Sequence, residues 1–327
     1  MTPRWDWSWE ETAGGGNAAE SGLHVPAWLT APKSVDEDDP HARAVFRRRR
    51  WTAVVAFALM LVALVAFVSA VAAGGGRHSA RALSRPPRPD PAQLAAQAAA
   101  ADAAAVDSTL ARTPVMVSGG GGAPEVALTF DDGPGPYTPR LVARLGALHA
   151  PATFFAVGSM ERYFSAGTLA EVRAGDAIGD HSETHPFMAM LNRRDQRLQL
   201  VDQARSLVAL GAPYPRLFRP PYGSYDRTTF QALRRQHMLM VLWSTDTGDF
   251  RRPGVAAIVQ NALSGARPGA IILMHDGGGD RSQTIAALPA IVRGLRARGL
   301  QPVTVPRLLR DDPPPAGQQI PAGLGGG

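Results

Sequence analysis

Two adjacent carboxylates, Asp131 and Asp132, follow an apolar run in the sequence LTFDDGPGP. Residues 128–130 predict the end of a buried strand, and the Gly-Pro pair after the aspartates predicts a turn. A buried carboxylate without a partner is costly, so two side by side need a reason. A division of labour supplies one, in which one Asp binds a cation while the other accepts a proton. Two aspartates that merely cap a turn are the alternative.

A histidine pair offers further ligands for a cation. His181 and His185 stand four residues apart in GDHSETHP, so one helical turn or a similar bend can aim both at one point. Pro186 disfavours helix at His185 and therefore favours the bend. With one carboxylate, the pair makes a common ligand set for a catalytic zinc ion with positions left for water. An HxxxH pair alone is weak, because surface pairs of this kind are frequent.

Three more motifs place polar residues after apolar runs: Arg219 in LFRPPYG, Asp246 and Asp249 in STDTGDF, and His275 in ILMHDG. A divalent cation held among such residues can polarise a carbonyl and activate a water. In that chemistry a carboxylate accepts the proton of the water and a histidine can protonate the leaving group. An oxyanion would be held by the metal and a backbone N–H.

These motifs lie among short apolar runs that alternate with helix-like stretches such as TPRLVARLGAL. The runs are residues 125–130, 152–157, 176–181, 216–220, 239–244, 269–275 and 301–305. Alternating strands and helices predict a parallel α/β sheet. Seven units indicate a closed or nearly closed barrel, with an open doubly wound sheet as the alternative. The carboxyl ends of barrel strands converge on one face, which would gather the polar residues there.

The motifs LTFDDGP, HSETHP, RPPYG, STDTGDF and ILMHDG resemble, in order and spacing, those of the polysaccharide deacetylases, the NodB-type domain of carbohydrate esterase family 4. ATFFAVG and AGDAIGDH are similar to the framework of that family. The resemblance covers roughly residues 124–308. It implies a distorted (β/α)7 barrel and metal-dependent N- or O-deacetylation of a glycan, usually with zinc.

Matched position by position, the resemblance implies roles for the metal side of the site. Asp132, His181 and His185 would bind the divalent metal ion, which is expected to be zinc. Asp131 would be the general base, and Arg219 would orient and polarise it.

The resemblance also implies roles for the substrate side. His275 would be the general acid, with its imidazole held by Asp249. The backbone N–H near Tyr222 would help to bind the oxyanion. Leu273 and Phe250 would line a pocket for the acetyl methyl group.

Two positions depart from the family pattern. Phe250 stands where the family usually has Trp, which changes the shape of the acetyl pocket. Asp180 stands before the first metal histidine where Asn is usual, so it either adds negative charge near the metal or faces away. Asp246 is the rival of Asp249 as the partner of His275.

Composition narrows the remaining classes. The 327 residues are 45% hydrophobic, which is typical of a globular chain. Cysteine is absent, which excludes disulfides, thiolate metal sites and a cysteine nucleophile. The formal net charge is +6, but no basic run is interleaved with aromatic residues, so nucleic-acid binding is not indicated.

An uncharged apolar run over residues 51–73 predicts a transmembrane helix. Its 23 residues span about 34 Å as a helix, enough to cross a bilayer. Residues 47–50 are all arginine, which places the N-terminus in the cytoplasm and the rest outside, although four further arginines follow the run. A cleaved signal peptide is the alternative.

The flanking segments complete the expected organisation. Residues 1–50, which contain the Trp-rich stretch RWDWSWEE, predict a disordered cytoplasmic tail, and residues 74–123 a flexible Pro/Gly/Ala-rich spacer. The deacetylase domain is expected over residues 124–310, followed by a disordered tail over 311–327. We therefore expect a single-pass membrane protein with an extracytoplasmic deacetylase domain that acts on an acetylated cell-wall glycan, namely peptidoglycan. The alternatives are a catalytically silent wall-binding module and an amide hydrolase acting on a lipid-linked sugar.

Overall fold

The structure is a computed structural model of the chain, and it describes residues 91–320. The expected cytoplasmic tail and transmembrane helix, the first part of the expected spacer, and residues 321–327 lie outside the described residues. Among the helices that the structure describes, none is both long enough and apolar enough to cross a membrane.

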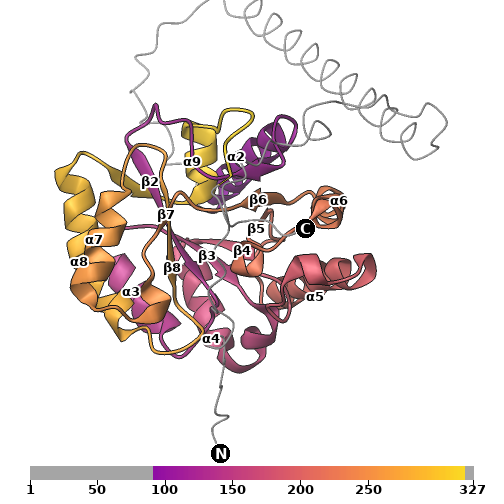
Figure 1. Cartoon of the computed structure of the whole chain (residues 1–327), viewed down its shortest axis with the longest axis horizontal. Helices are drawn as coiled ribbons and strands as arrows, with labels where there is room; N and C mark the ends of the chain where they lie inside the picture. The colour runs from indigo at the N-terminus through magenta and orange to yellow at the C-terminus, as the bar shows by residue number, and fades with distance from the viewer. Residues whose placement is uncertain (1–90, 321–327) are drawn as a thin grey trace, which may run out of the picture. The chain divides into compact units, whose positions relative to one another are not determined.

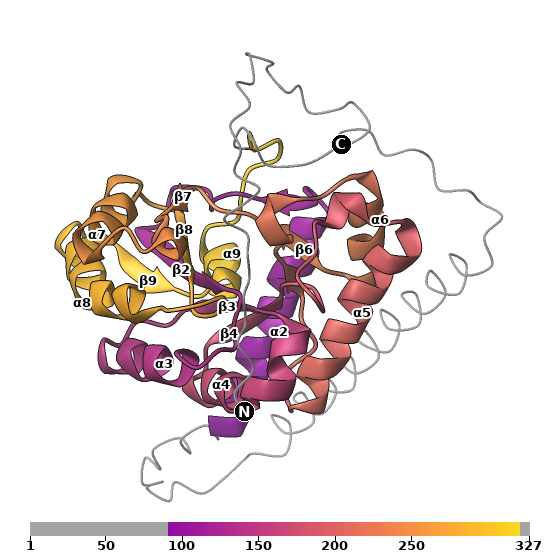
Figure 2. The same cartoon turned by 60° about the horizontal axis from the view of Figure 1, so that its bottom comes forward.

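One curled parallel sheet forms the centre of the described part (Figures 1 and 2). Its strands are β1 (Val115–Met116), β2 (Glu125–Asp131), β3 (Thr153–Ala156), β4 (Ala177–Asp180), β5 (Leu217–Phe218), β6 (Leu239–Val241), β7 (Thr245–Asp246), β8 (Ile271–His275) and β9 (Gln301–Val303). They are hydrogen-bonded in the order β1-β6-β5-β4-β3-β2-β8-β7, with β9 also paired to β2. Each of the seven predicted runs contains a strand, whereas the two-residue strands β1 and β7 were not predicted.

The hydrogen-bonded path ends at β1 and β7, so the sheet is a half-barrel consistent with a (β/α)7 barrel rather than a fully closed one. Helices lie around the outside of the strands (Figure 1). They are α2 (Pro91–Leu110), α3 (Thr138–Ala147), α4 (Gly158–Ala174), α5 (Arg193–Ala209), α6 (Arg227–Gln236), α7 (Val255–Ser264), α8 (Ser282–Ala297) and α9 (Val305–Asp311), with 3-10 turns η3 (Met188–Met190), η4 (Pro221–Gly223) and η5 (Asp249–Arg251).

Local sequence sets where these helices begin. The Asn192 side chain accepts hydrogen bonds from the first turn of α5, and Asp226 forms a reciprocal capping box with Thr229 at α6. In α3 the buried residues Leu141, Val142 and Leu145 form one apolar stripe, which faces the sheet.

Strand β2 shows how the fold aims polar groups into the barrel. All seven of its residues are buried, and neighbouring side chains point to opposite faces. Val126, Leu128 and Phe130 pack with the cluster that includes residues of α3 and α8, whereas Ala127 packs with the barrel interior. Asp131 shares the parity of Ala127, so the strand directs its carboxylate inward.

The folded part extends beyond the predicted domain limits of 124–310, at both ends. Within the expected spacer, α2 packs against α9, and β1 pairs with β6 and buries Met116. Within the expected disordered tail, the Asp312 carboxylate accepts hydrogen bonds from the backbone N–H groups of residues 121–123, and Gln318 bonds to Val117. The physical reason is that β1 and α2 cover an edge and an interior cluster of the sheet, which residues 124–310 alone would leave exposed.

Candidate active site

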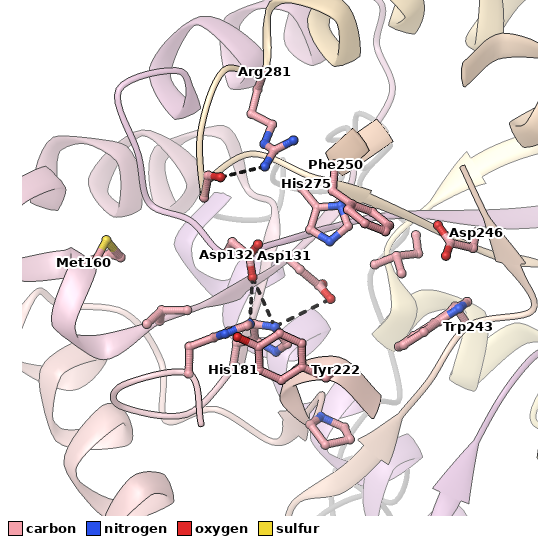
Figure 3. Close-up of a pocket in the computed structure, with 15 residues that line it drawn as sticks. Asp131, Asp132, Met160, His181, Tyr222, Trp243, Asp246, Phe250, His275 and Arg281 are labelled. Carbon is pink, nitrogen blue, oxygen red and sulfur yellow. Dashed lines mark hydrogen bonds and ion pairs between the residues drawn. The ribbon is translucent and has the colours of Figure 1, made fainter. Parts of the chain in front are cut away.

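Three predicted metal ligands converge at the carboxyl ends of the strands (Figure 3). Oδ1 of Asp132 lies 3.0 Å from Nε2 of His185 and 3.5 Å from Nε2 of His181. One ligand atom from each of the three residues lies within 4.8 Å of the others, and no other such group of three occurs among the described residues.

This geometry fits a single small cation. Four ligands placed tetrahedrally at zinc distances lie about 3.4 Å from one another, which is close to the two spacings around Oδ1 of Asp132. Two imidazoles and one carboxylate are also a donor set that zinc accepts, and three protein ligands leave a position for water or substrate. The identity of the metal remains a prediction.

The backbone around the ligands is bent rather than helical. Asp132 has a φ of 71° and His185 a φ of 58°, values that non-glycine residues seldom adopt. The His185 N–H donates to Oγ of Ser182 at 3.0 Å, and Nδ1 of His181 lies 2.7 Å from the carbonyl oxygen of Arg219. The predicted tight bend at the HxxxH pair is confirmed, and strained backbone of this kind is frequent at functional sites.

Asp131 lies beside the ligands and is held by a buried arginine. Oδ1 of Asp131 accepts a 2.8 Å hydrogen bond from Arg219, whose guanidinium is fully buried. Oδ2 lies 3.8 Å from Nε2 of His181, so the second oxygen faces the ligand group. Arg219 also donates to Oγ1 of Thr129 and to the carbonyl oxygens of Val241 and Leu242, which fixes its position.

His275 lies on the opposite side of the two aspartates from His181 (Figure 3). It is the register partner of Asp131 in the pairing of β2 with β8. Nδ1 of His275 lies 2.7 Å from Oδ1 of Asp249, and Oδ2 of Asp249 accepts hydrogen bonds from the His275 N–H and from Thr284. Burial alone would lower the pKa of His275, but the carboxylate of Asp249, with smaller contributions from Asp132 and Asp131, raises it to about 9.

A cavity of about 290 Å³ unites these groups. Its lining includes every predicted catalytic and metal-binding side chain except the more deeply buried Arg219 and Asp249, and it also includes the predicted substrate residues Tyr222, Phe250 and Leu273. Tyr222 has a φ of 58° within its turn. The distances place these residues together, while their individual roles stay predictions.

The structure shows the positions of Asp246 and Asp180, the two aspartates whose roles the sequence left open. Asp246 lines the cavity but accepts a hydrogen bond from Gly248, whereas Asp249 contacts His275. Asp180 is fully buried, is absent from the cavity lining, and accepts a hydrogen bond from the Ser182 N–H. Burial raises its pKa well above the usual range, so it is closer to the neutral amide of Asn than to a second charge.

Sequence reasoning missed several side chains of the site. Thr129 and Thr284 hold Arg219 and Asp249, and Trp243, Met160 and Arg281 line the cavity. Period-2 alternation of β2 could have identified Thr129, because it faces the same way as Asp131. No comparable pattern marks the other four, which come from loops and helix ends.

Fold and site together define the class: a curled parallel α/β half-barrel with a candidate metal centre at the carboxyl ends of its strands. A family profile described as "Polysaccharide deacetylase" matches residues 118–241, a range that contains Asp131, Asp132, the two histidine ligands and Arg219. The chain belongs to the polysaccharide deacetylase family, and the resemblance drawn from the sequence motifs is confirmed.

Individual relatives agree with this membership. The chain is 37% identical over 190 residues to a peptidoglycan-N-acetylglucosamine deacetylase of Bacillus cereus, covering 57% of this chain and 88% of the relative. It is 36% identical over 192 residues to a chitooligosaccharide deacetylase of Sinorhizobium fredii, covering 55% and 89%. A crystal structure of a peptidoglycan N-acetylglucosamine deacetylase superposes with a TM-score of 0.59 at 31% identity, covering 62% of this chain and 95% of that one.

Proposed function

We propose that the protein is a membrane-anchored, extracytoplasmic, zinc-dependent deacetylase that removes N-acetyl groups from the glucosamine units of peptidoglycan. The observation that carries this proposal is the convergence on one cavity of three metal-ligand side chains, a carboxylate held by Arg219, and a histidine held by Asp249.

The chain's own residues divide the reaction between them. Oδ2 of Asp131 faces the ligand group, so it accepts a proton from water while Arg219 holds the other oxygen. A divalent ion bound by Asp132, His181 and His185 supplies polarisation of the acetyl carbonyl and a lowered pKa for water. His275 has a pKa of about 9, so it is protonated near neutral pH and can give its proton to the departing amine nitrogen.

The rest of the cavity suits an acetyl group. Leu273 and Trp243 offer apolar surface in its lining, and the Phe250 ring lies edge-on to the His275 ring with centroids 5.6 Å apart. Tyr222 lines the same cavity, and in this proposal its backbone N–H would donate to the carbonyl oxygen as negative charge develops.

Peptidoglycan is proposed as the substrate because of the relatives that this chain matches over most of their length. They are named as deacetylases of peptidoglycan and of chitooligosaccharide, and both of these glycans contain N-acetylglucosamine. The apolar run at 51–73, with arginines before it, supports an anchor that leaves the domain outside the cytoplasm. The complete set of reactive side chains favours catalysis over a silent wall-binding module.

Acetate release by the full-length protein in detergent tests this function. The panel is peptidoglycan, chitin oligomers, poly-N-acetylglucosamine and acetylxylan, each assayed after chelation and after zinc is restored. Zinc-dependent release that is fastest from peptidoglycan is expected, and Asp131→Asn is the inactive control. Release from acetylxylan alone would contradict the proposal of N-deacetylation. Release from none of the four substrates would contradict the proposal that the protein is an active deacetylase.

Location needs a separate test. A reporter fused at the C-terminus should be active only outside the cytoplasm and should stay with the membrane fraction. A cytoplasmic reporter would contradict the orientation. A product released into the medium and starting near residue 73 would instead support the cleaved signal peptide.

A further inference from the structure

A stacked aromatic pair stands in solvent beside the metal ligands. The rings of Phe187 and Tyr222 are nearly parallel, with centroids 4.0 Å apart and an interplanar angle of 15°. Phe187 is 45% exposed and Tyr222 is 41% exposed. A large aromatic side chain normally stabilises a fold by being buried, so two exposed rings side by side need another explanation. Two stacked rings exposed at the rim of a cavity are a candidate binding surface, because together they present a flat apolar face to solvent.

The pair is anchored to the candidate metal centre. The Tyr222 ring lies edge-on to the His185 ring, with centroids 4.6 Å apart and an interplanar angle of 70°. Tyr222 also lines the cavity, whereas Phe187 does not, so the pair runs from the cavity outward (Figure 3 shows Tyr222). Phe187 is two residues beyond His185, which couples its position to the ligand loop.

The cavity is too small to hold a polysaccharide. Its volume of about 290 Å³ is at the lower end for small-molecule pockets, so it accommodates the acetylated sugar that reacts. The sugars on either side in the chain must therefore lie on the surface at the cavity rim. A pyranose ring has an apolar face of C–H groups and a polar edge of hydroxyl groups. A rigid aromatic face at the rim matches the apolar face while water keeps access to the hydroxyls.

We propose that Phe187 and Tyr222 form a sugar platform that binds the pyranose next to the one being deacetylated. This inference rests on the proposed function, because it assumes a glycan in the cavity. Phe187 is a specificity-determining residue in this scheme, since it touches only the neighbouring sugar. The platform makes a dimer a better substrate than a single sugar, and its contribution is expected to be about two- to tenfold, the size of a favourable aromatic contact.

Chain-length dependence provides the test. Acetate release by the full-length protein is measured on N-acetylglucosamine and on its dimer, and the dimer-to-monomer ratio of their kcat/KM values is compared between variants. Phe187→Ala is expected to lower this ratio about two- to tenfold through KM rather than kcat. Phe187→Tyr, which keeps the ring, should retain it.

Met190→Ala is the matched control, because Met190 is 84% exposed and near in sequence but takes no part in the stack. It should leave the ratio unchanged. An unchanged ratio in Phe187→Ala, or an equal fall in Met190→Ala, would overturn the platform. Metal content is measured in parallel, because a Phe187→Ala protein that loses its metal would show that the ring only supports His185, which also overturns the proposal.

A binding measurement separates this inference from the proposed function. The dimer and the monomer are titrated calorimetrically into Asp131→Asn protein, with and without Phe187→Ala. A preference for the dimer that Phe187→Ala removes supports the platform even if neither sugar is turned over. Turnover without any preference for the dimer would keep the deacetylase and overturn the platform.

Discussion

Two regions of the molecule bury ionisable side chains, and they differ in whether those side chains have partners. In the site, Arg219 pairs with Asp131 and His275 pairs with Asp249, and all four side chains are at most 12% exposed. In α4, Glu161 and Glu171 are equally buried. Neither oxygen of either carboxyl group has a hydrogen-bond partner within residues 91–320.

The partners decide which groups stay charged. Burial opposes the charge of Asp249, but His275 outweighs it and lowers the pKa of Asp249, while the pKa of His275 rises to about 9. In α4 burial is unopposed, and with Glu183 nearby it raises the pKa of Glu161 to about 8. The pKa of Glu171 is raised well above its usual range for the same reason, with Asp276 adding to the effect. Equal burial thus gives charged groups in one region and neutral groups in the other.

Removing the charge of Asp131 is expected to have the largest effect. Asp131→Asn should lower kcat about 10²- to 10⁴-fold, the usual contribution of a general base, while the protein keeps its metal. Asp132→Ala should lower metal content and activity together, because it removes a ligand. Metal content by elemental analysis and turnover on chitin oligomers check both. A metal-free Asp131→Asn protein with a metal-replete Asp132→Ala protein would reverse the two assignments.

Removing the partner of Asp131 should make the site resemble α4. Arg219→Met leaves a buried carboxylate without its cation, and the free energy of unfolding should fall by about 3–5 kcal/mol. Urea unfolding at pH 7 measures this loss. The double variant with Asp131→Asn should recover part of the stability, because no unpaired charge remains. A double variant as unstable as the sum of both singles would show that the pairing itself contributes nothing.

The sequence predicted the site, where the buried ionisable side chains are paired, far better than it predicted the unpaired glutamates of α4. Asp131, Arg219, Asp249 and His275 lie at strand ends, where the alternation of strands and helices predicts convergence, and the structure brings them together. Glu161 falls in a stretch that reads as an ordinary helix, and its burial depends on packing between distant elements. The spacer predicted over residues 74–123 includes β1 and α2 for a similar reason. A two-residue strand has no periodicity to detect, and the packing of α2 against α9 joins segments that are distant in the sequence.

Weakening the second pair should shift a pKa rather than abolish activity. Asp249 raises the pKa of His275, so Asp249→Asn should lower it, and a carboxylate partner typically contributes about 1–3 pH units. The acid form is then lost at lower pH, so the alkaline limb of the kcat profile should move down in pH while the acid side changes little. Asp246→Asn is the control, since Asp246 has no contact with His275 among the described interactions. An unmoved limb in Asp249→Asn would mean that another group sets this pKa.

The unpaired region predicts an effect with the opposite sign. The pKa of Glu161 is about 8 in the folded protein against 4.5 for the free side chain. Between these values the folded state holds a proton that the unfolded state has released, so the group costs stability increasingly as pH rises from 4.5 to 8. Glu161→Gln removes that cost. Its free energy of unfolding should exceed that of the parent protein by up to about 4 kcal/mol at pH 8, and the difference should shrink to below about 1 kcal/mol toward pH 5. Urea unfolding at both pH values measures it, with Asp202→Asn on the exposed side of α5 as the control for loss of a surface acid. A Glu161→Gln protein less stable than the parent at pH 8 would show that this carboxylate is paired after all, and the contrast between the two regions would fail.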